Sequence, residues 1–156
     1  MRYLILIFVI VLMMSLCPQV SAATIDNSTM QYYINIYNGK IDNAPDILKV
    51  LVGNQRIDLT ITRNDGSVYK AGFVMQNAHI SQTVEGGVAD PTIVINATED
   101  SINRIRSSSD PISQFQRERS FGGIDIQGKT YTTRAELGIV LSNTEVLKFF
   151  YNIFFG

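Results

Sequence analysis

The sequence predicts an α+β domain in which a five-stranded, mainly antiparallel sheet is covered by short helices. Apolar and polar residues alternate between residues 56 and 84, a period of two that is typical of half-buried strands. On both sides of that region apolar residues recur at helical spacing, with capping residues at the helix starts. Turn residues separate the segments at short intervals and no repeat divides the chain, so we expect one domain.

The first 22 residues have the composition of an export signal. Arg2 is their only charged residue, and residues 4–14 are an uninterrupted apolar run. Residues 20–22, Val-Ser-Ala, resemble a cleavage site, and the run is shorter than the roughly 20 residues that span a membrane. We therefore expect a secreted or extracytoplasmic protein. Two outcomes stay open: cleavage that leaves Ala23 as the first residue, or an uncleaved anchor formed by residues 4–16.

Charge and composition exclude several classes of function. The chain has 13 basic and 14 acidic residues, and only Arg2 among them lies in the first 22 positions, so the part that follows has a formal net charge of −2. This balance argues against nucleic acid as a partner. Cys17 is the only cysteine and His79 the only histidine. We therefore expect no disulfide, no metal and no cofactor in the exported part.

Two N-glycosylation sequons occur, Asn27-Ser28-Thr29 and Asn96-Ala97-Thr98. The first lies at the expected exposed start of the exported chain, and the second at a predicted turn from strand to helix. Asn27 is the more favourable glycan site of the two, because Thr98 is also a predicted helix cap.

Residues 23–44 form a predicted helical lead-in to the domain. Apolar residues at positions 30, 33, 34 and 37 have helical spacing, and Asn38-Gly39 is expected to end that helix. A second short helix is predicted at 46–52, after Pro45 and before Gly53.

Four strands are predicted in and after the alternating region, at residues 56–62, 68–75, 78–84 and 92–96. Asn64-Asp65-Gly66 joins the first two strands as a hairpin, and Asn77 marks the next turn. The apolar residues of the first two strands fall on one face, which is the predicted inner face: Ile57, Leu59, Ile61, Tyr69, Ala71, Phe73 and Met75.

Two helices with clear starts follow the fourth strand. Thr98 is a predicted N-cap, and the acidic residues Glu99 and Asp100 favour the helix dipole. Asp110-Pro111 is a second start, with proline at the first helical position.

The second of these helices is expected to end at Gly122-Gly123. A short fifth strand at 124–126 then closes at Gly128. A final helical region is predicted from about Thr132 to about Ser142.

From Arg56 onward this order of elements resembles the sterol carrier protein-2 family. That family has an antiparallel meander, an acidic turn into a strand, two short helices, a short strand that ends in glycine, and a closing helix. Four segments carry the resemblance: Ala89-Asp90-Pro91-Thr92-Ile93-Val94-Ile95, Glu99-Asp100-Ser101-Ile102, Ser109-Asp110-Pro111-Ile112-Ser113-Gln114-Phe115 and Ile124-Asp125-Ile126-Gln127-Gly128. They assign residues 45–142 to a domain of this type. The chain departs from the family at residues 116–120, where a short turn is usual, and in its export signal, since the family is largely intracellular.

The resemblance implies a noncatalytic protein that binds an apolar small molecule or lipid in a cavity between the sheet and its helices. Aromatic and methionine side chains on the predicted inner face agree with such a cavity. They fit a filled core equally well, and the domain would then be a cell-surface interaction or structural module. The candidate cavity-lining residues are Ile57, Leu59, Ile61, Tyr69, Phe73, Met75, Phe115, Phe150 and Phe154.

No residue pattern indicates an enzyme. His79 is the one candidate general base, and a single histidine in a strand is more often a surface or hydrogen-bonded residue. The serines at 107–109 have no histidine or acid fixed beside them, and no glycine pair has the context of a phosphate loop. Four arginines form either a patch for anionic head groups or, as we expect, a solvated face: Arg104, Arg106, Arg117 and Arg119.

Residues 143–156 are a predicted apolar C-terminal helix. Ser142-Asn143-Thr144-Glu145 has the spacing of a capping box, and four of the eight phenylalanines lie in the last eight positions. Such a wide apolar surface has to be covered on a soluble monomer. We expect the helix to dock over the sheet as a lid on the cavity. Insertion into a membrane surface and contact with a partner protein are the alternatives.

Overall fold

The computed structural model describes residues 26–44, 46, 49 and 53–155, without the side chains at positions 29, 140–141 and 150–155. The predicted export segment and most of the predicted helix at 46–52 lie outside these residues. Among the helices with described positions, none combines the length and the hydropathy that a membrane span requires.

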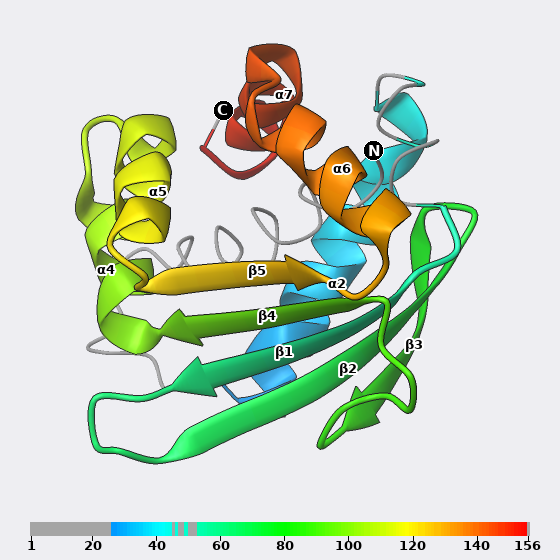
Figure 1. Ribbon diagram of the computed structural model, residues 1–156, viewed down its shortest axis with the longest axis horizontal. Coiled ribbons are helices and arrows are strands. Elements are labelled where there is room, and N and C mark those ends of the chain that lie inside the picture. Colours follow the sequence, from blue (N-terminus) through cyan, green and yellow to red (C-terminus); the bar gives the residue numbers. More distant parts are fainter. Residues whose placement is uncertain (1–25, 45, 47–48, 50–52, 156) are drawn as a thin grey trace.

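Five strands form one sheet, as the sequence pattern predicts. Their bounds are Arg56–Thr62 (β1), Val68–Gln76 (β2), His79–Glu85 (β3), Ile93–Thr98 (β4) and Ile124–Gly128 (β5). The strands lie in the order β3-β2-β1-β4-β5 (Figure 1). β1 and β4 pair in parallel, and the other three pairs are antiparallel. The predicted five-stranded, mainly antiparallel sheet is therefore confirmed.

The inner face of the sheet is one continuous apolar layer. The register gives the pairs Ile57–Phe73, Leu59–Ala71 and Ile61–Tyr69 between β1 and β2, and Ile57–Ile93, Leu59–Ile95 and Ile61–Ala97 between β1 and β4. All of these side chains are buried. Residues opposite each other on neighbouring strands point to the same side of a sheet, so these pairs build a single core surface.

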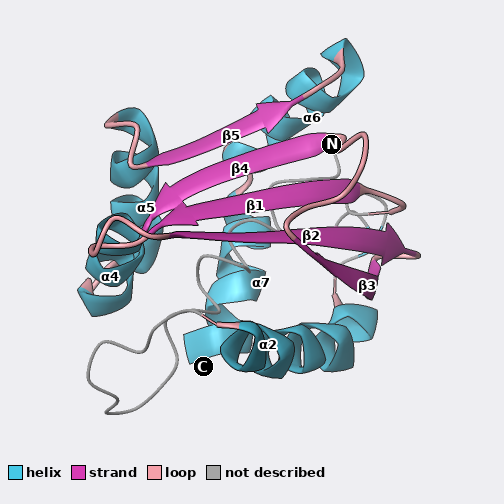
Figure 2. Ribbon diagram, turned by 90° about the horizontal axis from the view of Figure 1, so that it is seen from below, coloured by secondary structure: helices cyan, strands magenta, loops and turns pink. Residues whose placement is uncertain are grey.

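Helices cover the inner face and the ends of the sheet (Figures 1 and 2). Their bounds are Asn27–Lys40 (α2), Ile41–Asn43 (η1, a 3₁₀ turn), Glu99–Ser107 (α4), Pro111–Ser120 (α5), Tyr131–Leu141 (α6) and Thr144–Phe155 (α7). α2 and α7 lie beneath the sheet in Figure 2, and α4 and α5 pack at the end where β4 stops. α6 follows β5 at the edge of the sheet. The fold class is therefore α+β.

The segment between β3 and β4 crosses the outer face of the sheet. The buried Val88 donates a 2.6 Å hydrogen bond from its backbone N–H to Asp58 Oδ1. A Cβ added at Gly72 would lie 2.5 Å from the Val88 nitrogen. Only glycine therefore lets this loop approach β2 so closely.

α2 binds the free edge of β3. Tyr37 Oη donates to the Ala78 carbonyl at 2.6 Å, and burial raises the pKa of this phenol. The Asn38 side chain donates to the Ile80 carbonyl and accepts from the Ile80 N–H, both at 2.9 Å. Asn38 was predicted to end the helix, but it lies inside α2, because its amide is used by the edge strand. This contact occupies backbone groups that an unpaired edge would expose.

The predicted helix caps are mostly confirmed. Thr98 Oγ1 accepts from the Ser101 N–H at 3.2 Å, and Asp110 Oδ1 accepts from the Ser113 N–H at 3.1 Å. α7 begins where expected, but Asn143 is its capping residue. Its Oδ1 accepts from the backbone N–H groups of residues 145 and 146, at 3.0 and 3.2 Å. The predicted cap, Ser142, donates its hydroxyl back to α6 instead.

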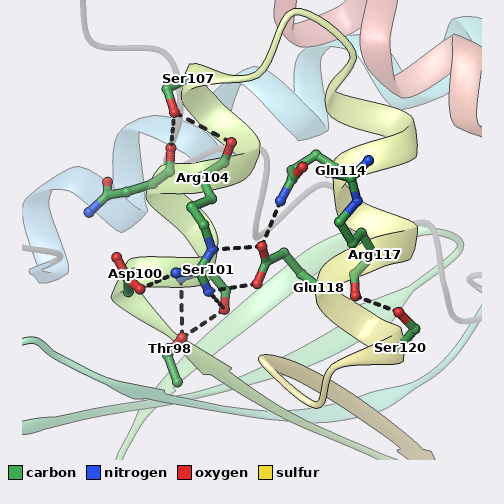
Figure 3. Close-up of polar contacts among 10 residues, drawn as sticks. Thr98, Asp100, Ser101, Arg104, Ser107, Gln114, Arg117, Glu118 and Ser120 are labelled. Carbon is green, nitrogen blue, oxygen red and sulfur yellow. Dashed lines mark hydrogen bonds and ion pairs between the residues drawn. The ribbon is translucent and has the colours of Figure 1, made fainter.

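An ion pair joins α4 to α5 (Figure 3). Arg104 donates from Nε and Nη2 to the two carboxylate oxygens of the buried Glu118, at 2.7 and 2.8 Å. Gln114 donates to the same carboxylate at 2.7 Å, and Asp100 pairs with Arg104 from the solvent side. These bonds fix the position of α5 relative to α4.

Candidate ligand-binding site

The predicted cavity-lining residues lie in the packed core. Seven of the nine belong to one buried cluster in which no member is more than 8% exposed: Ile57, Leu59, Ile61, Tyr69, Phe73, Met75 and Phe115. The side chains of the other two, Phe150 and Phe154, lie outside the described part. α7 contacts the same cluster through the buried Val146 and Leu147. Its role as a lid stays a prediction.

A ligand-sized groove lies elsewhere, between α5, β5 and α6. Its volume is about 590 Å³, and its described lining residues are Arg119, Ile126, Gln127, Gly128, Lys129, Arg134, Leu137 and Gly138. We call this hollow the β5 groove. In Figure 1, α5 and α6 stand near the two ends of β5, which is an edge strand of the sheet.

The floor of the β5 groove is apolar because of two periodicities. On β5, the half-buried Ile126 lies opposite the buried Ile95 and so points to the inner side. On α6, positions 134, 137 and 138 lie on one helix face, since they are three or four residues apart. Leu137 is buried there, while Gly138 leaves open space: outside its own helix backbone and chain neighbours, an added Cβ would meet no described atom within 4 Å.

Gly128 brings α6 close to the end of β5. A Cβ at this position would lie 2.8 Å from the Arg134 nitrogen and 2.7 Å from the Thr133 methyl carbon. Thr130 Oγ1 accepts from the Thr133 N–H at 3.1 Å and caps the start of α6. The short connection of Lys129 and Thr130 therefore holds the first turn of α6 against the strand.

Three cations stand around the apolar floor: Arg119, Lys129 and Arg134. Arg119 is half-buried, its guanidinium carbon lies 5.9 Å from the Phe115 ring centroid, and it donates to Gln116 Oε1 at 3.3 Å. Burial lowers the pKa of Arg119, although Asp125 opposes this effect. No acidic residue is among the described lining residues of the groove.

A second, smaller pocket lies under α2. Its volume is about 210 Å³, and its lining comprises Asn27, Met30, Gln31, Ile34, Tyr69, Ala71, Thr83 and Glu85. Tyr69 Oη donates to Asn27 Oδ1 at 3.2 Å. Burial is the main reason that the pKa of Tyr69 is raised. This pocket is below the range of about 300–1,000 Å³ that is usual for small-molecule sites.

The candidate catalytic and cationic residues do not form a common site. His79 Nε2 lies 3.3 Å from Asp42 Oδ1, at the surface. Within the described ranges, no group of three or more His, Cys, Asp or Glu residues could hold a metal ion. Of the four predicted arginines, Arg104 is paired with Glu118, and Arg119 alone lines the β5 groove.

Lys129, Arg134 and Gly138 were not among the residues predicted for the site. The spacing of Arg134, Leu137 and Gly138 on one face of the final helix was an available signal. Their position beside Arg119 depends on the turn at Gly128, which local patterns do not reveal.

No protein-family model matches the sequence, and no curated protein matches it. Solved structures do. The sterol carrier protein domain 2 of Helicoverpa armigera is similar with a TM-score of 0.51 and 15% identity, over 83% of this chain and 96% of that one. A conserved hypothetical protein of Thermus thermophilus, for which a sterol carrier identity has been suggested, is similar with a TM-score of 0.53 and 14% identity, over 88% of this chain and 94% of that one. The ubiquinone synthesis protein UbiJ-SCP2 is similar with a TM-score of 0.50 and 9% identity, over 77% of this chain and 93% of that one.

The sheet order, the covered inner face and the edge groove define an α+β domain with a ligand-sized hollow. The matched structures align with the fold of this chain over almost their full length. The chain has the sterol carrier protein-2 fold.

Proposed function

We propose that the protein binds a lipid or another apolar small molecule without transforming it, and carries it outside the cytoplasmic membrane. The β5 groove is the observation that carries this proposal. Its volume of about 590 Å³ lies within the usual range for small-molecule sites, and its floor, formed by Ile126 and Leu137, is apolar, as is typical of them. A sterol carrier protein domain with the same fold supports the ligand class.

The extracytoplasmic location rests on the sequence of residues 1–22. A single basic residue, an apolar run and a small-residue exit are the three parts of an export signal. Release after cleavage and anchoring through residues 4–16 would both place the domain on the outer side of the membrane.

A specific observation favours a second candidate function. The predicted cavity residues of β1 and β2 pack against each other with at most 8% exposure, as in a filled core. A domain of this kind would serve as a cell-surface interaction or structural module. The two functions differ in whether the β5 groove holds a ligand.

Filling the groove separates these candidates. Gly138→Phe places a large side chain on the face of α6 that already carries Arg134 and Leu137. We expect this change to weaken the binding of pyrene-labelled dodecanoic acid at least about tenfold, which corresponds to about 1.4 kcal/mol. The melting temperature should stay at or above the wild-type value, because glycine inside a helix costs about 0.5–1 kcal/mol relative to alanine. Fluorescence titration and thermal unfolding measure the two effects.

Gly39→Phe is the matched control. Gly39 also lies in a helix, α2, and an added Cβ there meets no described atom within 4 Å outside its own helix backbone and chain neighbours, but it is not among the described lining residues of the groove. This variant should bind the probe as the wild type does. Equal affinities in the two variants would show that the ligand does not occupy the β5 groove.

A further inference from the structure

Resting on the proposed function, we propose that the β5 groove selects a single-chain amphipath with an anionic head group over a neutral lipid. The head group would be a carboxylate or a phosphate monoester. Lys129 and Arg134 bind it at the rim, and Arg119 supplies a third positive charge. The alkyl chain lies on Ile126 and Leu137.

The distribution of charge is the first argument. Beyond its first 22 residues the chain has a formal net charge of −2, yet the described lining of the groove holds three cations and no acid. A concave site lined by one sign of charge focuses the field and attracts ligands of the opposite sign. An acidic protein with this local excess is therefore arranged to attract an anion to one place.

The pairing of the cations is the second argument. Neither Lys129 nor Arg134 makes an ion pair or a side-chain hydrogen bond with any residue that the structure describes. Arg104, in contrast, is engaged by Glu118 and Asp100. The donors of Lys129 and Arg134 are thus available to a ligand, and hydrogen bonds between charged groups are about twice as strong as neutral ones.

The burial of Arg119 is the third argument, because an anion stabilises a partly buried cation more strongly than an exposed one. Its guanidinium is half-buried and lies against the Phe115 ring, where it has lost part of its hydration. A partly desolvated cation is stabilised by an opposite charge more than an exposed one is. Asp125 already supplies part of that charge, and an anionic head group adds to it, whereas a neutral sterol hydroxyl cannot.

Selectivity then follows from a difference between two ligands. A neutral lipid covers Ile126 and Leu137 as well as an anionic one does, but it leaves the half-buried Arg119 without an added opposite charge and forms no ion pair with the exposed Lys129 and Arg134. An anionic amphipath gains the same apolar contact and pairs the charges. The head group therefore decides the preference, and the chain supplies the shared affinity.

Two probes that differ only in charge test this inference: pyrene-labelled dodecanoic acid and its methyl ester. The wild type should bind the acid at least about tenfold more tightly than the ester, and the ratio should shrink as salt is added. Lys129→Gln/Arg134→Gln should bring the affinity for the acid close to that for the ester and leave ester binding unchanged. Arg56→Gln/Lys70→Gln, which removes two exposed cations from β1 and β2 outside the groove, should keep the preference.

The outcomes distinguish this inference from the proposed function. Equal wild-type affinity for acid and ester would overturn the selectivity and leave apolar binding intact. Binding of neither probe would overturn the proposed function and the inference with it. Dodecyl phosphate that displaces the acid would support a general anion site, and displacement by dodecanoate alone would restrict the site to carboxylates. Displacement by inorganic phosphate at the same concentration would show that the chain plays no part, and would also overturn the inference.

Discussion

Phe73→Asp should abolish cooperative folding of the domain. Phe73 is fully buried in β2, between Ile57 of β1 and Thr83 of β3. Removing a buried phenylalanine side chain costs about 3–5 kcal/mol, and an unpaired carboxylate in its place adds a further desolvation cost. This total cost is close to the whole free energy of unfolding of a typical domain, which is about 5–15 kcal/mol. Circular dichroism should show no cooperative thermal transition.

Val68→Asp controls for the charge itself. Val68 lies at the start of the same strand and is 52% exposed. A surface change of this kind usually alters stability by no more than about 0.5 kcal/mol. Were Phe73→Asp to melt at the wild-type temperature, the buried inner face of β2 and the register that defines it would be wrong.

Glu118→Gln should destabilise the protein at neutral pH and alter its response to acid. Hydrogen bonds from Arg104 are the main cause that lowers the pKa of Glu118 to about 2 from its usual 4.5, with Ser101 and Gln114 adding to the effect and burial opposing it. One pKa unit corresponds to about 1.4 kcal/mol, so a shift from 4.5 to about 2 means that the charged form stabilises the folded state by roughly 3 kcal/mol. The glutamine variant loses this contribution.

The sign of the pH effect follows from the direction of the shift. The folded pKa lies below the unfolded one, so the stabilisation is fully present above about pH 4.5 and is lost as the pH falls towards about 2. Wild-type stability should therefore decline more steeply than that of Glu118→Gln across this window. The pKa values of Asp65 and Asp110 are also lowered, by hydrogen bonds from Ser67 and Ser113. Both proteins keep these residues, so the difference between them reports Glu118 alone.

Urea unfolding of both proteins at several pH values measures this difference. Glu85→Gln is the control, because Glu85 is exposed on the edge strand β3. It should follow the wild-type curve. Parallel but offset curves would contradict the lowered pKa of Glu118, and superimposed curves would show that its pairing with Arg104 contributes nothing to stability.

The local parts of the fold could be predicted from the sequence. The alternation of Ile57, Leu59 and Ile61 identified β1 because side chains on a strand point to opposite faces in turn. Thr98 and Asp110 identified two helix starts because a short polar side chain can bind the free N–H groups of a first turn. Both kinds of signal depend only on residues that are close in the chain.

Predictions failed where a distant partner decided the structure. Asn38 has the local pattern of a helix end, but its amide binds Ile80, 42 residues away. β3 begins at His79, one residue later than predicted, because Asn77 and Ala78 adopt positive φ angles of 48° and 71° in the preceding turn. A local sequence pattern predicts neither a tertiary hydrogen bond nor a backbone conformation that alanine rarely adopts.

The β5 groove could be predicted least of all. Arg119, Lys129 and Arg134 come from a helix, a connection and another helix. Nothing in their spacing indicates that they meet. The predicted ligand-binding residues lay mostly on the sheet, because apolar strand residues are as typical of a cavity wall as of a filled core. Only the geometry of the β5–α6 connection brings these cations around one hollow.

Native mass spectrometry of freshly purified protein tests the binding of an apolar ligand most directly. The wild-type protein should carry an additional mass of one small apolar molecule, which is lost at higher collision energy. Gly138→Phe should give the mass of the polypeptide alone, and Gly39→Phe should keep the adduct. The bare polypeptide mass in all three proteins would contradict a carrier function and favour an interaction module with a filled core.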